Sequence, residues 1–230
     1  DRAWGQGRVR QAFQPDNSAA PASPPEGRVR VFALWADGGE GKTRVVVKWL
    51  TRVRDDGWRG AGPVLVHSFY SQGCDERRNA SSDFFFEQAL AHFGYRGPPV
   101  TDPTERGRKL AALVADQIGL LVLDGLEPLQ HPRNFDEGRL KDAAIRALVL
   151  SLANAGRGLC VITSRQPVVE LRDRTGTAVV VQELNRLDPI AGSALLRQLA
   201  VRGTERELRE AVEEFHGHAY SLMLLGTYLG

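Results

Sequence analysis

Residues 36–43, with the sequence ADGGEGKT, have the composition of a phosphate-binding loop. They follow the apolar run Val29–Trp35 and precede an apolar-periodic segment from Thr43, so a strand, a turn and a helix are predicted. Glycines let backbone N–H groups converge on phosphate oxygens, and a helix start adds its dipole. In such loops the lysine reaches the terminal phosphates and the next hydroxyl binds Mg²⁺. The predicted nucleotide contacts are Ala36, Asp37, Gly38, Gly39, Glu40, Gly41, Lys42, Thr43 and Arg44.

One position departs from the usual pattern G-x-x-x-x-G-K-[ST], because Ala36 stands where the first glycine is expected. Alanine is tolerated there if its φ angle stays negative. The competing interpretation is a glycine-rich connection between strand and helix that carries Lys42 as an ordinary surface residue.

A second group of polar residues follows the apolar run in IGLLVLDGLEPLQ. Asp124 stands at the carboxyl end of a predicted strand, where parallel sheets bind ligands, and is expected to hold the Mg²⁺ shell together with Thr43. Glu127 is close enough to act as a general base toward water. The alternatives are that Asp124 caps the next turn and that Glu127 is a surface loop residue.

The segment GLCVITSRQPV places Arg165 at the end of a further strand. An arginine at this edge can neutralise the γ-phosphate during transfer, although it could equally be an ordinary surface arginine. We therefore expect Glu127, Arg165 and Lys42 to take part in the chemistry. His216 and His218 lack partners at zinc spacing, and the segment His67–Gly73 is interpreted only as a hinge or partner-binding loop.

The elements that position these residues alternate along the chain. Near-continuous apolar strands separated by helices indicate a parallel sheet covered on both faces. The expected strands are Val29–Trp35, Val64–Phe69, Gly119–Leu123, Leu159–Thr163 and Ala178–Val181. The expected helices between them are Thr43–Val53, Asp83–Phe93, Thr104–Ala115 and Leu140–Ala155.

Three segments follow from composition. Residues 1–27 contain a Pro/Ala/Ser-rich linker, residues 28–184 form the nucleotide-binding domain, and residues 185–230 form a helical subdomain. Asp188-Pro189 and the Thr204…Glu207 capping box mark helix starts in the last segment. Because the chain starts at Asp1, without methionine, we expect it to be part of a longer polypeptide.

Composition is that of an ordinary globular protein. A net charge of +2 argues against a nucleic-acid surface, and no segment is long and apolar enough to span a membrane. Cys74 and Cys160 have no metal or redox spacing, which favours a reducing, cytoplasmic location.

Together, ADGGEGKT, LLVLDGLEPL, LCVITSRQPV and EFHGHAYSLMLLGTYL resemble the core of STAND proteins, signal-transduction ATPases of the NB-ARC and NACHT types. Asp-Gly-x-Glu at 124–127 is nearer to the NACHT pattern. The resemblance implies a P-loop α/β fold with a parallel five-stranded sheet in the order 2-3-4-1-5, plus a small helical subdomain.

The resemblance also implies a function. The chain would bind ATP or ADP with Mg²⁺, hydrolyse ATP slowly, and act as a nucleotide switch in defence or regulation. Its partners would be effector and sensor domains of the same polypeptide, and activation would cause self-association. Gly217 and His218 fall where NB-ARC proteins carry a nucleotide-contacting G-x-P, although Ala219 replaces the proline. A winged-helix module would follow the helical subdomain.

Two other functions are compatible with the same loop. A P-loop kinase or metabolic NTPase would need an acceptor site and a lid, and no arginine-rich lid segment is visible. A nucleotide-binding module with little hydrolysis would also be consistent with Ala36 and Ala219.

Overall fold

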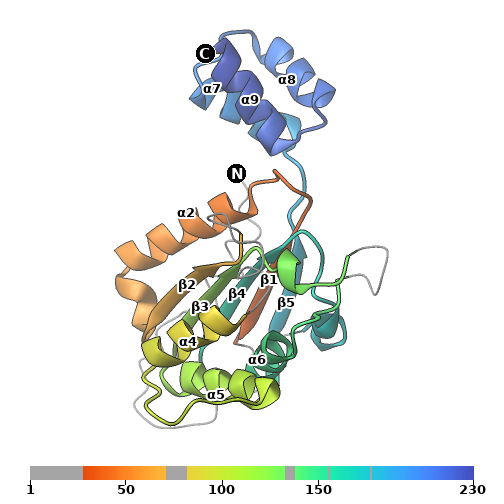
Figure 1. The fold of residues 1–230 in the computed structure, drawn as a ribbon. Coiled ribbons are helices and arrows are strands. Elements are labelled where there is room, and N and C mark those ends of the chain that lie inside the picture. The colour runs from red at the N-terminus through yellow and green to blue at the C-terminus, as the bar shows by residue number, and fades with distance from the viewer. Residues whose placement is uncertain (1–27, 71–81, 133–137, 155, 177) are drawn as a thin grey trace.

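The computed structural model describes residues 28–70, 82–132, 138–154, 156–176 and 178–230, so the predicted linker in residues 1–27 lies outside it. Its centre is a parallel five-stranded sheet with the order β2-β3-β4-β1-β5, which confirms the predicted fold class (Figure 1). The strands are β1 (Val31–Trp35), β2 (Val64–Ser68), β3 (Leu120–Asp124), β4 (Leu159–Ser164) and β5 (Val179–Glu183).

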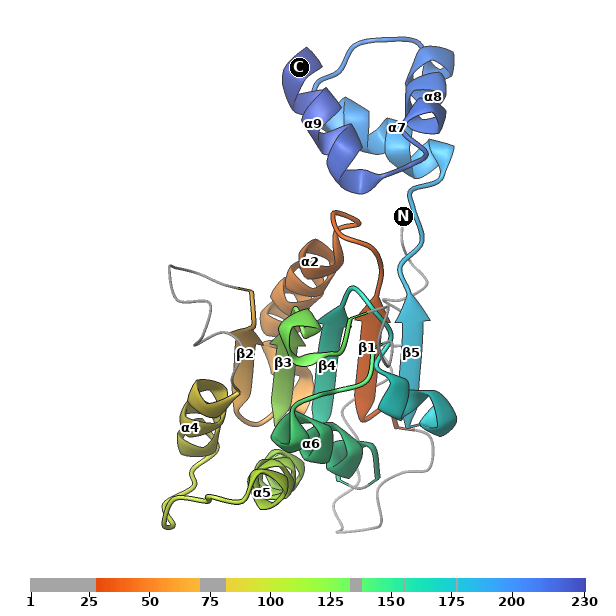
Figure 2. The ribbon, with the colours of Figure 1, turned by 45° about the vertical axis from the view of Figure 1, so that its right-hand side comes forward.

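Helices cover both faces of the sheet (Figure 2). α2 (Lys42–Asp55) packs on one face, and α4 (Asp83–His92), α5 (Pro103–Asp116) and α6 (Ala143–Asn154) pack on the other. Side chains alternate along β1, because Val31 and Ala33 belong to the cluster under α4–α6 whereas Phe32 and Leu34 lie under α2. A sheet buried on both faces needs apolar side chains in both directions, which explains the near-continuous apolar runs.

The chain after β5 forms three helices around a small core of their own. These are α7 (Pro189–Gln198), α8 (Glu205–Glu214) and α9 (Ala219–Leu229), with the buried residues Leu196, Leu208, Val212 and Leu222. The predicted starts are confirmed: Asp188 accepts from the Ala191 amide at 2.7 Å, and Thr204 and Glu207 form a capping box. The division at residues 184–185 stays a prediction.

The helix predicted over residues 140–155 begins at Ala143 in the structure, three residues later than predicted. Asp142 accepts a hydrogen bond from the Ile145 amide at 2.8 Å and so caps a helix that begins at Ala143. Leu140 forms an isolated antiparallel bridge with Gln130 instead of a helical turn.

Three short 3₁₀ helices complete the described residues: η1 (Gly57–Gly60), η2 (Glu127–Leu129) and η3 (Val169–Arg174). Within the described residues, no helix has both the length and the apolar character needed to cross a membrane.

Candidate functional site

The predicted site residues gather at one edge of the sheet, where the parallel strands end. Trp35, Ser164 and Glu183 are register partners at the ends of three strands, and Ser68 is paired with Asp124 at the ends of two others. The phosphate loop follows β1 at this edge, and the helices α7–α9 lie beyond it (Figures 1 and 2). The edge is the place where open α/β sheets bind ligands.

The phosphate loop has the backbone that its glycines allow. Gly39 and Gly41 have φ angles of 79° and 85°, which residues with a Cβ rarely adopt. Gly41 is the N-cap of α2 and offers no side chain to cap it, so the first-turn N–H groups are available to an anion. Ala36 is absent from the described non-glycine residues with positive φ, so the missing glycine does not strain the loop.

Lys42 is buried inside the loop. Its ammonium donates to the carbonyl oxygens of Ala36 at 2.7 Å and Asp37 at 2.9 Å. Burial lowers the pKa of Lys42, while the carboxylates of Glu127 and Asp124 oppose that shift. An ammonium has three N–H donors, and the third is available for a phosphate oxygen. A surface lysine in an ordinary turn would be neither buried nor held in this way.

Thr43 and Asp124 lie side by side although 81 positions separate them in the sequence. The Thr43 hydroxyl donates to Asp124 Oδ1 at 2.9 Å, and the Thr163 hydroxyl donates to the same oxygen at 2.6 Å. Thr163 also accepts from the Gly125 amide at 2.9 Å, which ties the ends of β3 and β4 together. Asp124 is therefore held by two hydroxyl groups, one from the first turn of α2 and one from β4.

These oxygen atoms suit Mg²⁺. That ion usually takes one or two protein oxygen ligands and completes its shell with water and substrate phosphates. Thr43 and Asp124 would supply the protein ligands, and Thr163 would orient the carboxylate. Among the residues that the structure describes, no group of three or more His, Cys, Asp or Glu side chains forms a metal cluster.

Glu127 begins the short helix η2 close to Arg165 and Tyr70. Its Oε1 accepts from the Tyr70 hydroxyl at 2.8 Å and lies 4.0 Å from Arg165 Nε. Its Oε2 is buried and has no hydrogen-bond partner among the described protein atoms. One oxygen of the predicted base is thus already bound, while the other has no donor among the described residues.

The helical subdomain contacts the phosphate loop directly. His218 Nε2 lies 3.0 Å from the Gly38 carbonyl oxygen, and the buried Glu40 pairs with Arg186 at 3.4 Å. A Cβ on Gly39 would lie 2.8 Å from the His218 ring and 2.9 Å from Tyr220. The second glycine of the loop is therefore required by packing as well as by its φ angle.

The remaining predicted contacts differ in their surroundings. Asp37, within the loop, and Arg44, in the first turn of α2, are exposed, and their contacts with a nucleotide stay predictions. Gly217 has a φ angle of 67°, and a Cβ there would lie 2.1 Å from the Leu187 carbonyl oxygen. Gly217 is needed for the turn before α9, and its contact with a nucleotide stays a prediction.

Sequence reasoning missed three residues at this edge: Tyr70, Arg186 and the role of Thr163 toward Asp124. Tyr70 follows β2, and β2 is next to β3 in the sheet order. The predicted strand order could have indicated the position of Tyr70, because it places the residue after β2 beside the carboxylates that follow the apolar run of β3.

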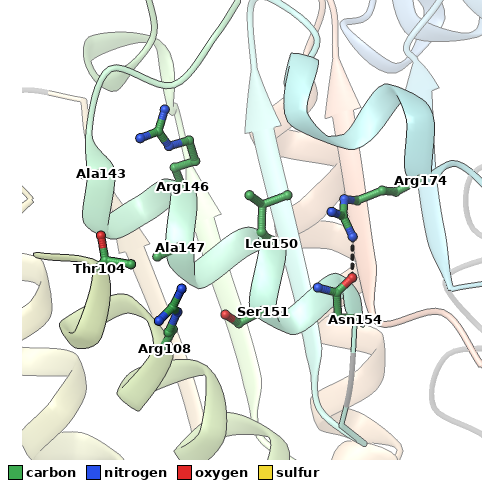
Figure 3. Close-up of a pocket in the computed structure, with 9 residues that line it drawn as sticks. All are labelled: Thr104, Arg108, Ala143, Arg146, Ala147, Leu150, Ser151, Asn154 and Arg174. Carbon is green, nitrogen blue, oxygen red and sulfur yellow. Dashed lines mark hydrogen bonds between the residues drawn. The ribbon is translucent and has the colours of Figure 1, made fainter.

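A pocket of about 310 Å³ lies elsewhere, between α5, α6 and η3 (Figure 3). Arg108, Arg146 and Arg174 line it, and Arg174 donates to Asn154. None of its lining residues belongs to the phosphate loop or to the strand ends that carry Asp124 and Arg165. The pocket is therefore separate from the candidate nucleotide site.

No protein-family model matches the sequence, and no curated protein matches it. Among solved structures, the chain is similar to the crystal structure of a Signal Transduction ATPase with Numerous Domains (STAND) protein with a tetratricopeptide repeat sensor from Pyrococcus horikoshii. The TM-score is 0.58 at 15% sequence identity, and the match covers 96% of this chain and 28% of that chain. The chain thus spans less than a third of that protein's length. The likeness establishes that this α/β fold is one also found in a STAND protein.

Proposed function

We propose that residues 28–230 form the nucleotide-binding core of a multidomain signalling ATPase. The observation that supports this most directly is the contact between Thr43 and Asp124, with Lys42 buried in the adjoining loop. A hydroxyl after the loop lysine and a carboxylate at the end of another strand of the sheet are the two groups that hold Mg²⁺ in P-loop NTPases. An ordinary glycine-rich turn has no need for this pair.

The residues divide the work in the proposed reaction. Loop N–H groups and Lys42 would bind the β- and γ-phosphates, and Thr43 and Asp124 would hold Mg²⁺, which would neutralise charge on the phosphates. Glu127 accepts a proton from the attacking water. Arg165 neutralises charge that develops on the γ-phosphate.

The proposed output is a change in how the helical subdomain sits on the loop. His218 and Arg186 contact loop residues, so a nucleotide that changes the loop backbone changes those contacts. In the complete polypeptide this motion would expose surfaces for self-association and act on attached effector and sensor domains, in defence or regulation. Gly217 and His218 are proposed as the nucleotide-facing residues of the subdomain.

Calorimetry with ADP and a non-hydrolysable ATP analogue tests the binding step. Lys42→Ala should weaken both affinities at least tenfold, about 1.4 kcal/mol, because a charge-assisted contact to phosphate is lost. Lys48→Ala is the matched control, since Lys48 is an exposed lysine of the same helix. Equal affinities for the wild type and Lys42→Ala would refute the phosphate-loop assignment.

A second experiment separates the proposed ATPase from its alternatives. Incubation with γ-labelled ATP, Mg²⁺ and candidate acceptors should release labelled phosphate. Label on an acceptor would instead identify a kinase. Tight nucleotide binding with neither product would identify a nucleotide-binding module without hydrolysis.

A further inference from the structure

We propose that Tyr70 is the positioning residue for Glu127, fixing one carboxylate oxygen so that the other faces the attacking water. The inference rests on the proposed ATPase function and names a residue beyond the phosphate loop, Asp124, Glu127 and Arg165. It is carried by the contacts of the Tyr70 hydroxyl, the contacts of its ring, and the two different environments of the Glu127 oxygens.

The hydroxyl contact involves only one oxygen of the base. Tyr70 donates to Glu127 Oε1 at 2.8 Å, across 57 positions of sequence. Glu127 Oε2 is buried and accepts no hydrogen bond from the described residues. A buried carboxylate oxygen normally has a donor, so an available one beside a phosphate loop marks a place for water. The hydrogen bond to Oε1 thereby holds the carboxylate in an orientation in which Oε2 would face the attacking water.

The ring of Tyr70 is fixed in turn by a glycine. Gly125 has a φ angle of 75°, and a Cβ there would lie 2.3 Å from the ring. The ring consequently lies directly against the turn that joins Asp124 to Glu127. A side chain at position 125 would force either the ring or the turn to shift.

The proximity of Arg165 gives a reason why Glu127 would need a positioning residue. Its Nε lies 4.0 Å from Glu127 Oε1, and its guanidinium carbon lies 5.8 Å from the centre of the Tyr70 ring. Arginine and carboxylate groups tend to form close, bidentate pairs, and such a pair here would occupy both the base and the cation meant for the γ-phosphate. Tyr70 binds Oε1 and places its ring near the guanidinium, so it contacts both members of the Arg165–Glu127 ion pair and can fix their relative positions.

The effect of Glu127 on Tyr70 is consistent with this contact. Burial, followed by the charge of Glu127 and the hydrogen bond to it, raises the pKa of Tyr70 to about 12. The hydroxyl therefore remains a donor throughout the pH range in which ATP hydrolysis is measured.

The test is a kinetic double-mutant cycle with a matched tyrosine as control. Tyr70→Phe keeps the ring on Gly125 and removes only the hydroxyl, so kcat should fall about tenfold while KM and the affinity for an ATP analogue stay within about twofold. In a Glu127→Gln background, which has lost the base, Tyr70→Phe should have no further effect on kcat. Tyr95→Phe, which removes a similar hydroxyl bond to the Pro98 carbonyl, should leave kcat unchanged.

A second measurement needs no nucleotide. Chemical denaturation of the wild type, Tyr70→Phe, Glu127→Ala and the double variant should show that losing the hydroxyl costs less stability once Glu127 is gone. Additive losses would mean that the hydrogen bond does not form, and that would overturn the inference.

The outcomes distinguish this inference from the proposed function. If the wild type binds no nucleotide or hydrolyses none, the proposed ATPase function fails, and the inference fails with it. If the wild type hydrolyses ATP but Tyr70→Phe keeps its kcat, or slows the Glu127→Gln variant equally, only the positioning role of Tyr70 is wrong.

Discussion

His218 Nε2 donates to the carbonyl oxygen of Gly38 at 3.0 Å and so joins α9 to the phosphate loop. A carbonyl oxygen can only accept, which assigns the proton to Nε2 and leaves Nδ1 to accept from the Ser221 amide at 3.2 Å. The same imidazole thus caps α9 and holds the loop.

The two roles of His218 can be separated by substitution. His218→Asn keeps a side chain that can cap the Ser221 amide but is too short to reach Gly38. Losing a hydrogen bond worth about 1 kcal/mol should make hydrogen exchange at the amides of Gly38–Gly41 about fivefold faster. The control is His216→Asn, because His216 is exposed and its left-handed backbone suits asparagine. Unchanged exchange in His218→Asn would show that the helices do not restrain the loop.

Thr163 should matter for Mg²⁺ although it is not proposed as a ligand. Thr163→Val removes the hydroxyl that donates to Asp124 and accepts from the Gly125 amide. Residues that orient metal ligands typically contribute 10- to 100-fold to affinity, so the Mg²⁺ dependence of nucleotide binding should shift by about that factor. Ser164→Ala, which removes a buried hydroxyl that donates to Gln130, should leave it unchanged. An equal shift in both variants would indicate general loss of packing.

Arg165 should distinguish ATP from ADP. It lies beside Glu127 and close to Gly38, and its proposed contact is the γ-phosphate, a group that ADP lacks. Arg165→Ala should reduce the affinity for a non-hydrolysable ATP analogue and spare ADP, changing their ratio by about 5- to 150-fold. Paired titrations of the wild type and the variant measure this ratio. Equal losses for both nucleotides would assign Arg165 to general electrostatics or folding.

Alkaline pH should reveal the environment of Tyr70. Its pKa in the folded chain is raised to about 12 from an ordinary value of 10.0, so the neutral phenol is favoured by folding. The associated stability is fully present below pH 10 and is lost as the pH rises toward 12. Urea denaturation should therefore show that Tyr70→Phe loses less stability than the wild type over this interval. Cys160 also has a raised pKa but is common to both proteins, so the difference isolates Tyr70. Parallel losses in the two proteins would place Tyr70 in water.

The elements that could be predicted from sequence are those whose signals are local. The glycines before Lys42, the apolar run before Asp124 and the capping pair Thr204 and Glu207 each lie within one short segment. Helix ends were less predictable. For α6 the apolar periodicity predicts a start at Leu140, but the side chain of Asp142 caps a helix that begins at Ala143.

The contacts between distant segments could not be derived in the same way. Nothing in the residues around Tyr70 indicates that its hydroxyl reaches Glu127, since that depends on β2 and β3 being neighbours. Arg186 is one of many arginines in the sequence, and only the fold singles it out by bringing it to the buried Glu40. Pairings of this kind depend on where the strands and helices are placed, and periodicity does not carry that information.

The pairing of Glu40 with Arg186 has a thermodynamic consequence, because Glu40 belongs to the loop that would enclose phosphate. One short backbone segment would then take part in two equilibria, helix docking and nucleotide binding. Thermodynamic linkage makes the two effects reciprocal. If bound nucleotide changes the equilibrium constant for docking by some factor, docking changes the affinity for nucleotide by the same factor. A substitution on the helical side that has no proposed phosphate contact, such as Arg186→Ala, would then shift the measured dissociation constant by at most the factor by which nucleotide shifts the docking equilibrium. The helical subdomain, whose docking would respond to bound nucleotide, would therefore also affect the affinity for that nucleotide.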